Sequence, residues 1–199
     1  RGLGDVYKRQ SDNTDPIERL FIQWGFSQVF PVKTMCAHVT TWNKNSSVKF
    51  RTDVAMMCKL GFDIKLADMS KDDETYCRTA VQNYNRLKPV VLEGDMYRLV
   101  SPYGSNHTST MYVGKDKDKA AVFAFDIHPR YAEKILPVRL QGLDADKMYR
   151  VKEINLMPGA NSSLSGNGEV FSGEFLMNVG LNLFTAQQLN SRVIEVVAE

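Results

Sequence analysis

Cysteine is scarce in this chain of 199 residues, which has only Cys36, Cys58 and Cys77. No two of them have the CxxC spacing, so the sequence predicts neither a disulfide framework nor a zinc cluster. Cys36 and His38 are close enough in sequence to share a metal ion, but the remaining ligands would have to come from far along the chain. The three cysteines are therefore interpreted as buried thiols, and no metal site is predicted.

Long apolar runs and an excess of one charge are also absent. No run approaches the roughly 20 apolar residues that a membrane-spanning helix needs. The formal net charge is +2, and the basic residues are scattered, as in the solvated segment 115–119 where lysine and aspartate alternate. The hydrophobic fraction of 43% and the charged fraction of 24% are typical of a globular protein. These features predict a folded protein with no nucleic-acid partner and no membrane partner.

The first ten residues, RGLGDVYKRQ, differ in character from the rest of the chain. They do not begin with methionine, and they have no periodicity typical of a helix or a strand. We interpret residues 1–10 as a non-native scar from a library or from assembly and leave them out of the fold prediction.

Residues 11–93 alternate between helical and strand patterns. Asp15, Pro16 and Glu18 form a capping signal, which predicts a helix that Gly25 ends. The pattern then predicts a strand, a helix stopped by Gly61, a strand, and a helix ended by Pro89: residues 35–41, 52–60, 62–66 and 70–89. Strands separated by helices indicate parallel β/α units, and two strands cannot close a sheet. The segment is predicted to be the C-terminal part of a (β/α)8 TIM barrel.

Residues 94–199 show strand patterns only. Six runs rich in β-branched and aromatic residues are predicted strands: MYRLVSP, TSTMYVGK, AAVFAFDI, LPVRLQG, YRVKEINL and SRVIEVVA. Turn residues separate these runs, and the spacing is typical of an antiparallel β-sandwich domain. The polar segment 159–168 is predicted to be a long surface loop.

One loop aspartate, Asp12, is a candidate for catalysis. It lies three residues before the helix cap Asp15, in a loop that enters a helix, and such loops carry the active sites of β/α barrels. Asp15 is a poorer candidate for an acid. As a helix cap its carboxylate accepts hydrogen bonds from backbone N–H groups, and these bonds favour the ionised form. The residues alone leave Asp12 as one loop aspartate among several, and most loop carboxylates are turn formers.

Five segments give the chain a resemblance to a known family. SDNTDPIERLFIQWG (11–25) resembles the SDNTD-x-IERL-x-IQ segment of glycoside hydrolase family 36 α-galactosidases. Four later segments keep the order of that family: MCAHVTTWN, FRTDVAMMCKLGFDI, GDMYRLVSPY and FSGEFLMNVGL. The segments HVTTWN and FDIHPR are most similar in sequence to those of family members from Bacteroides-type bacteria. Because the segments run in order from Ser11 almost to the end, the resemblance is specific.

The resemblance implies a retaining α-galactosidase that removes terminal α-linked galactose from oligosaccharides, such as those of the raffinose type. The first aspartate of SDNTD is the family's general acid/base, and it falls on Asp12. The family's nucleophile belongs to a Lys-Trp-Asp motif, and a Cys-Ser-x-Gly-Gly segment of the family helps to hold the sugar. This sequence contains neither motif. We therefore expect the chain by itself to be inactive. Two carboxylates suffice for a double displacement, so no cofactor is expected.

Two alternatives stay open at this point. One is a related family 36 activity, either α-N-acetylgalactosaminidase or galactosyl transfer, because the residues that read the 2-substituent of the sugar are not in this sequence. The other is a non-catalytic carbohydrate-binding module. The resemblance also leaves open a bacterial cytoplasmic or periplasmic location, and a homo-oligomer of the complete protein.

Three further residues are candidates for the site. His38 is either a wall of a sugar pocket or, as we favour, a structural barrel histidine. Trp42 either stacks on a sugar or anchors a loop. Arg51 either contacts the substrate or, as we favour, forms a structural ion pair with a carboxylate near the barrel rim.

Overall fold

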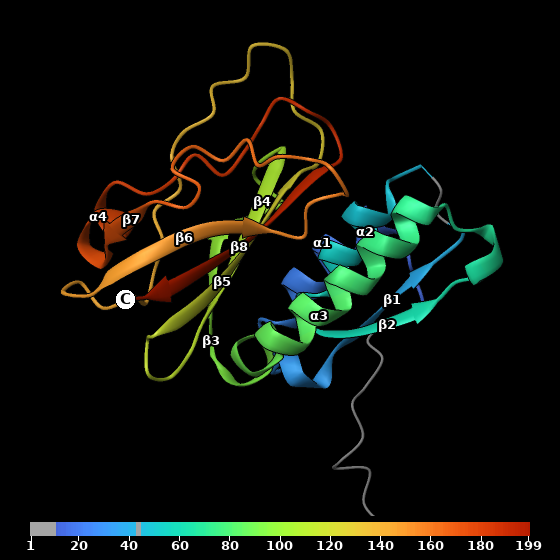
Figure 1. Ribbon diagram of the computed structural model, residues 1–199, viewed down its shortest axis with the longest axis horizontal. Helices are drawn as coiled ribbons and strands as arrows, with labels where there is room; N and C mark the ends of the chain where they lie inside the picture. Colours follow the sequence, from blue (N-terminus) through green and yellow to red (C-terminus); the bar gives the residue numbers. More distant parts are fainter. Residues whose placement is uncertain (1–10, 43–44) are drawn as a thin grey trace, which may run out of the picture.

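The computed structural model of the protein describes residues 11–42 and 45–199. The predicted scar at residues 1–10 lies outside the described residues. The described part begins with helices around a two-stranded parallel sheet and continues as a six-stranded antiparallel sheet (Figure 1). This is the order of α/β and all-β structure that the sequence pattern predicts. No helix within the described ranges is long and apolar enough to cross a bilayer.

The α/β part contains two β/α units. Its elements are α1 (Pro16–Phe26), η2 (Val32–Thr34), β1 (Cys36–Thr40), α2 (Val48–Ala55), β2 (Lys59–Asp63), η3 (Leu66–Asp68) and α3 (Lys71–Glu93). Strands β1 and β2 are parallel, and Cys36 pairs with Lys59 at one end while Thr40 pairs with Asp63 at the other. Parallel neighbours need a crossover connection. Helix α2 supplies it, as in a β/α barrel.

The capping prediction for α1 is confirmed, whereas the predicted range of α2, residues 52–60, is wrong. The Asp15 carboxylate accepts hydrogen bonds from the backbone N–H groups of Ile17 and Glu18, at 2.9 and 3.0 Å. Helix α2 begins at Val48 rather than near residue 52, because Ser47 caps it by accepting from the N–H of Phe50 at 3.1 Å. The whole unit is thus shifted toward the N-terminus, and β2 also begins earlier than predicted.

Helix α3 does not end at Pro89, as its sequence predicts, but continues to Glu93. A proline inside a helix removes one backbone N–H donor, which weakens the helix locally. Beyond the proline, however, Val90 and Val91 are 8% and 1% exposed. Their burial in the core keeps the last turn in place.

The antiparallel sheet has the strand order β3-β4-β5-β8-β6-β7. Its elements are β3 (Asp95–Val100), β4 (His107–Val113), β5 (Lys119–Asp126), β6 (Met148–Ile154), β7 (Val170–Ser172), α4 (Gly173–Asn178) and β8 (Asn190–Ala198). The predicted strand LPVRLQG forms only a single antiparallel bridge, between Val138 and Leu181. Helix α4 is missing from the prediction. It begins at a cap in which Ser172 accepts from the N–H of Phe175 at 3.1 Å.

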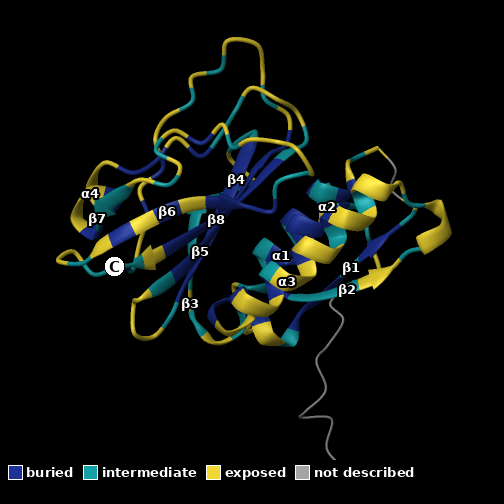
Figure 2. Cartoon of the chain, in the orientation of Figure 1, coloured by how far each residue is buried: buried dark blue, intermediate teal, exposed yellow. Residues whose placement is uncertain are grey.

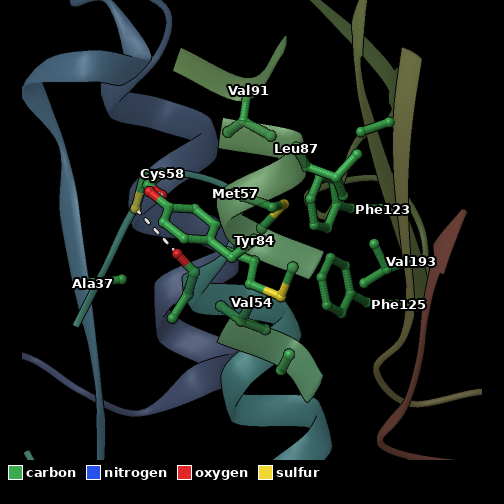
Figure 3. Close-up of a cluster of buried hydrophobic side chains, with 14 of the residues drawn as sticks. Ala37, Val54, Met57, Cys58, Tyr84, Leu87, Val91, Phe123, Phe125 and Val193 are labelled. Atoms are coloured by element: carbon green, nitrogen blue, oxygen red, sulfur yellow. Dashed lines mark hydrogen bonds between the residues drawn. The ribbon is translucent and has the colours of Figure 1, made fainter. Parts of the chain in front are cut away.

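The central strands of this sheet are buried on both faces, and the two halves of the chain share a core. Strand β4 is buried along its whole length, and β5 along all but its first residue (Figure 2). One face packs against α2 and α3, where Leu87 and Val91 lie beside Phe123 and Phe125 of β5 (Figure 3). The other face packs against loop segments that include the buried Leu140. The α/β part is therefore fixed directly to the sheet.

Candidate active site

The loop that precedes α1 is held by a series of local hydrogen bonds. The N–H of Asn13 donates to Ser11 Oγ at 3.0 Å, and the N–H of Asp15 donates to Asn13 Oδ1 at 2.9 Å. Asp15 then caps α1. Asp12 lies within these turns with an exposed side chain. Asp15 is thus the residue that caps α1, as the sequence indicates. Asp12 does not cap the helix, and its carboxyl group lies on the surface of the loop.

Asp12 lines an open pocket of about 280 Å³. The pocket lies beside β1 and reaches Asp63, the last residue of β2. Its walls are residues 11–14, Arg19, residues 36–38, Thr40, Trp42 and Asp63. The carboxyl ends of parallel barrel strands are where active sites form. The pocket runs along β1 and brings Asp12, His38 and Trp42 together, and Thr40 and Asp63 place one part of it at the carboxyl ends of the strands.

Alternation along β1 decides which side chains face this pocket. Successive side chains of a strand point to opposite faces. Ala37 and Val39 belong to the hydrophobic core shared with the helices. Cys36, His38 and Thr40 alternate with them and line the pocket, which Ala37 also borders. In a closed barrel this second face is the interior one.

Arg19 is a pocket residue that the sequence analysis missed. It is 3% exposed, and its guanidinium donates to the carbonyl of Cys36 at 2.9 Å and to that of Ser11 at 3.3 Å. These bonds tie α1 and its preceding loop to β1. The only sequence signal was a charged residue between the apolar Ile17 and Leu20 of the helix stripe.

His38 is half-buried and lies against a glycine of the neighbouring strand. It pairs in register with Gly61. A Cβ atom on Gly61 would lie 2.4 Å from His38 Cδ2, closer than any real contact. Gly61, predicted to stop a helix, instead leaves room inside β2 for the imidazole that forms the pocket wall.

Gly61→Ala is therefore expected to displace His38 and to lower the free energy of unfolding by about 1–3 kcal/mol, the usual cost of overpacking. Urea denaturation measures this change. Gly25→Ala is the matched control, because the nearest atom to a Cβ there is the Tyr103 hydroxyl at 3.7 Å. Equal free energies of unfolding for the two variants would contradict the prediction, because they would show that the His38 side chain moves aside without loss of stability.

Trp42 and Arg51 differ in their relation to the pocket. Trp42 lies on its rim with 77% of its surface exposed. The guanidinium of Arg51 donates to the carbonyl oxygens of Thr40 and Ser47, where the sequence predicts a carboxylate partner. Burial lowers the pKa of Arg51, and the charge of Asp73 opposes this change. Arg51 thus holds the end of β1 rather than lining the pocket.

The described ranges 11–42 and 45–199 contain no group of three or more His, Cys, Asp or Glu residues that could hold a metal ion. Cys36 and His38 share the pocket wall without forming such a group. Cys36 and Cys58 are buried thiols, and burial raises the pKa of Cys58 to about 12. Cys77 is only partly buried.

Two family matches cover most of the chain. Residues 6–94 match the family described as Melibiase, and residues 107–196 match the glycosyl hydrolase family 36 C-terminal domain. The chain belongs to glycoside hydrolase family 36. The two matches agree with the resemblance carried by the five ordered segments.

Family 36 relatives and solved structures extend over nearly the whole chain. Alpha-galactosidase 2 of Hypocrea jecorina is 34% identical over an alignment of 190 residues, and the match covers 92% of this chain and 24% of that protein. The crystal structure of α-galactosidase AgaB from Geobacillus stearothermophilus superposes with a TM-score of 0.82 at 28% identity, covering 96% of this chain and 25% of that one. A variant of AgaA from the same bacterium, solved in complex with raffinose, has a TM-score of 0.82 at 27% identity, with 95% and 25% coverage.

The chain thus spans about a quarter of the length of these family 36 relatives. Their sources are a fungus and Geobacillus, so the resemblance to Bacteroides-type members stays a prediction.

Proposed function

We propose that the complete protein of which this chain is a part hydrolyses terminal α-linked galactose from oligosaccharides, with Asp12 as its general acid/base. The observation that carries the proposal is the position of Asp12 on the SDNTD loop, in an open pocket beside β1. The α-galactosidase names of the family 36 relatives, and the raffinose complex of one of them, support a galactoside substrate.

The proposed mechanism is a retaining double displacement. A nucleophilic carboxylate attacks the anomeric carbon and displaces the leaving oxygen, which Asp12 protonates. Asp12 then takes a proton from the water that attacks the glycosyl-enzyme, and galactose leaves with its configuration retained. The two carboxyl groups of such enzymes lie about 5–5.5 Å apart. Since this chain has no Lys-Trp-Asp motif, we propose that the nucleophile comes from a part of the protein outside it.

We further propose that residues 11–93 are the last β/α units of the catalytic barrel and residues 94–199 the C-terminal β domain. Helix α3 ends at Glu93 and β3 begins at Asp95, which supports a boundary at Gly94. A Cβ atom at Gly94 would lie 2.4 Å from the carbonyl oxygen of Val90 and 2.5 Å from that of Val113. Only glycine lets the chain turn this closely from the helix into the sheet.

The alternative activities receive no specific support from the pocket. The residues expected to read the 2-substituent of the sugar lie outside this chain, so α-N-acetylgalactosaminidase and galactosyl transfer stay alternatives. A carbohydrate-binding module does not require a carboxylate beside the carboxyl ends of parallel strands. The position of Asp12 therefore favours the hydrolase.

The test compares the complete protein with the 199-residue chain on 4-nitrophenyl α-galactoside. We expect hydrolysis by the complete protein, with retained anomeric configuration in the proton NMR spectrum of the first product. We expect no turnover by the chain alone, because it supplies only one of the two carboxylates. Turnover by the chain alone, or preference of the complete protein for the 2-acetamido substrate, would contradict the proposal.

A further inference from the structure

We propose that a second pocket, on the β domain, binds a neutral sugar through two adjacent hydroxyl groups. This pocket has a volume of about 450 Å³, within the range of small-molecule sites. It lies between His107 at the start of β4 and the segment 133–139, which belongs to the gold loop above the sheet in Figure 1. None of its lining residues lines the pocket at Asp12.

The orientation of His107 is set by a buried aspartate. His107 Nδ1 lies 2.8 Å from Asp126 Oδ1. Asp126 is 1% exposed and also accepts from the hydroxyl of Thr185 at 2.6 Å and from Asn190 Nδ2 at 2.9 Å. A carboxylate with this many donors acts as an acceptor, so Nδ1 donates its hydrogen to Asp126. In the tautomer that this bond selects, the other nitrogen, Nε2, is an acceptor.

This Nε2 atom is buried and has no hydrogen-bond partner among residues 11–42 and 45–199. The His107 side chain is 6% exposed and forms part of the pocket lining. The Glu133 Oε1 atom lies 3.8 Å from Nε2, but a carboxylate oxygen cannot donate to it. Buried acceptors are rarely left without a donor. The missing donor is what a ligand would bring to this pocket.

Glu133 is held as a second acceptor on the same pocket. Its carboxylate accepts from Asn106 Nδ2 at 3.1 and 3.2 Å and from the backbone N–H of Arg130 at 2.9 Å. The bond from the Arg130 backbone, followed by that from Asn106, holds the pKa of Glu133 below its usual range. Two fixed acceptors 3.8 Å apart are complementary to two neighbouring O–H donors, such as a vicinal diol on a sugar ring.

The rest of the lining fits a sugar better than a cation. Lys134 and Arg139 also line the pocket, and their charges disfavour an ammonium ligand. Leu99 and Phe184 supply apolar surface for the C–H face of a pyranose, and the Phe184 ring stacks on His107 with centroids 4.7 Å apart.

The test is an NMR titration of the 199-residue chain, labelled with ¹³C at histidine, with methyl α-galactoside. We expect a saturable shift of the His107 Cε1–H signal, and no such shift for His128. Glu133→Gln should weaken binding at least about tenfold, whereas Glu169→Gln, the same change at an exposed glutamate, should leave it unchanged. No saturable shift, or equal binding by the two variants, would overturn the proposal.

Two further probes separate the proposed ligand from its competitors. Cyclohexanol offers one hydroxyl and should bind at least about tenfold more weakly than the galactoside. Cyclohexylamine binding more tightly would make this a cation site and overturn the proposal. If the isolated chain fails to fold, crystals of the complete protein soaked in methyl α-galactoside decide the matter. A sugar on His107 and Glu133 is expected, and an ordered water there without sugar would refute it.

Discussion

Replacing Asp12 by alanine in the complete protein is expected to slow the hydrolysis of galactosides with poor leaving groups by about 10²–10⁴-fold, the usual contribution of a general acid/base. A sugar leaving group needs a proton as the glycosidic bond breaks, whereas a nitrophenolate hardly does. The loss should therefore be largest for raffinose and smallest for an activated aryl galactoside. Steady-state kinetics on both substrates measures the difference.

A second readout tests the role of Asp12 rather than its mere presence. Without the base, the glycosyl-enzyme should accumulate, and azide should restore turnover of the activated substrate because it attacks without needing deprotonation. Asp72→Asn is the matched control, since Asp72 is an exposed carboxylate that does not line this pocket. Equal losses in both variants, or a lack of azide rescue, would remove Asp12 from the acid/base role.

Asp53→Ala is expected to lower the free energy of unfolding by about 3–5 kcal/mol, because it leaves a largely buried ammonium group without its partner. Asp53 is 0% exposed. Its Oδ2 accepts from Lys49 Nζ at 2.6 Å and from Ser191 Oγ at 2.7 Å, and its Oδ1 accepts from the Tyr76 hydroxyl at 2.8 Å. Burial, followed by the charge of Asp53, raises the pKa of Tyr76 well above its usual value.

This network joins separate elements of the fold, which is why its loss should be large. Asp53 lies on α2, Tyr76 on α3 and Ser191 on β8, while Asn155 follows β6 and donates to Asp53 Oδ1 at 3.0 Å. Urea denaturation of Asp53→Ala measures the effect, and Asp68→Ala, at an exposed aspartate, should cost little. A loss below about 1 kcal/mol for Asp53→Ala would mean that packing alone holds the helices on the sheet.

The first residues of the helices show how much of the secondary structure local sequence patterns predict in this protein. Asp15 is followed directly by a strong helical pattern and acts as the predicted cap, and Ser70, at the predicted start of the third helix, caps α3. Ser47 acts in the same way but is followed by Val48-Lys49-Phe50, a run with weak helical periodicity, so its helix is predicted too late. Pro89 is a strong stop signal that buried contacts of Val90 and Val91 override.

The strands of the antiparallel domain show the same limit of prediction from local sequence patterns. Strands β4 and β5 are predicted from their β-branched and aromatic residues. The segment LPVRLQG has a similar composition, yet it forms only one bridge, at Val138. Its buried residues face the sheet as a covering layer. Composition reports that a segment is apolar and extended, but it does not report whether a neighbouring backbone is available for pairing.

By itself, the sequence determined the order of α/β and antiparallel structure, the family, and the choice of Asp12 over Asp15 as candidate acid. These depend on short motifs and on periodicity, which are local. Only the tertiary structure decided that Cys36, His38 and Thr40 face the pocket, that Gly61 makes room for an imidazole, and that Asp53 and the His107–Asp126 pair are buried. These features depend on contacts between residues far apart in the chain. The sequence of one segment does not specify which distant strand or helix will pack against it.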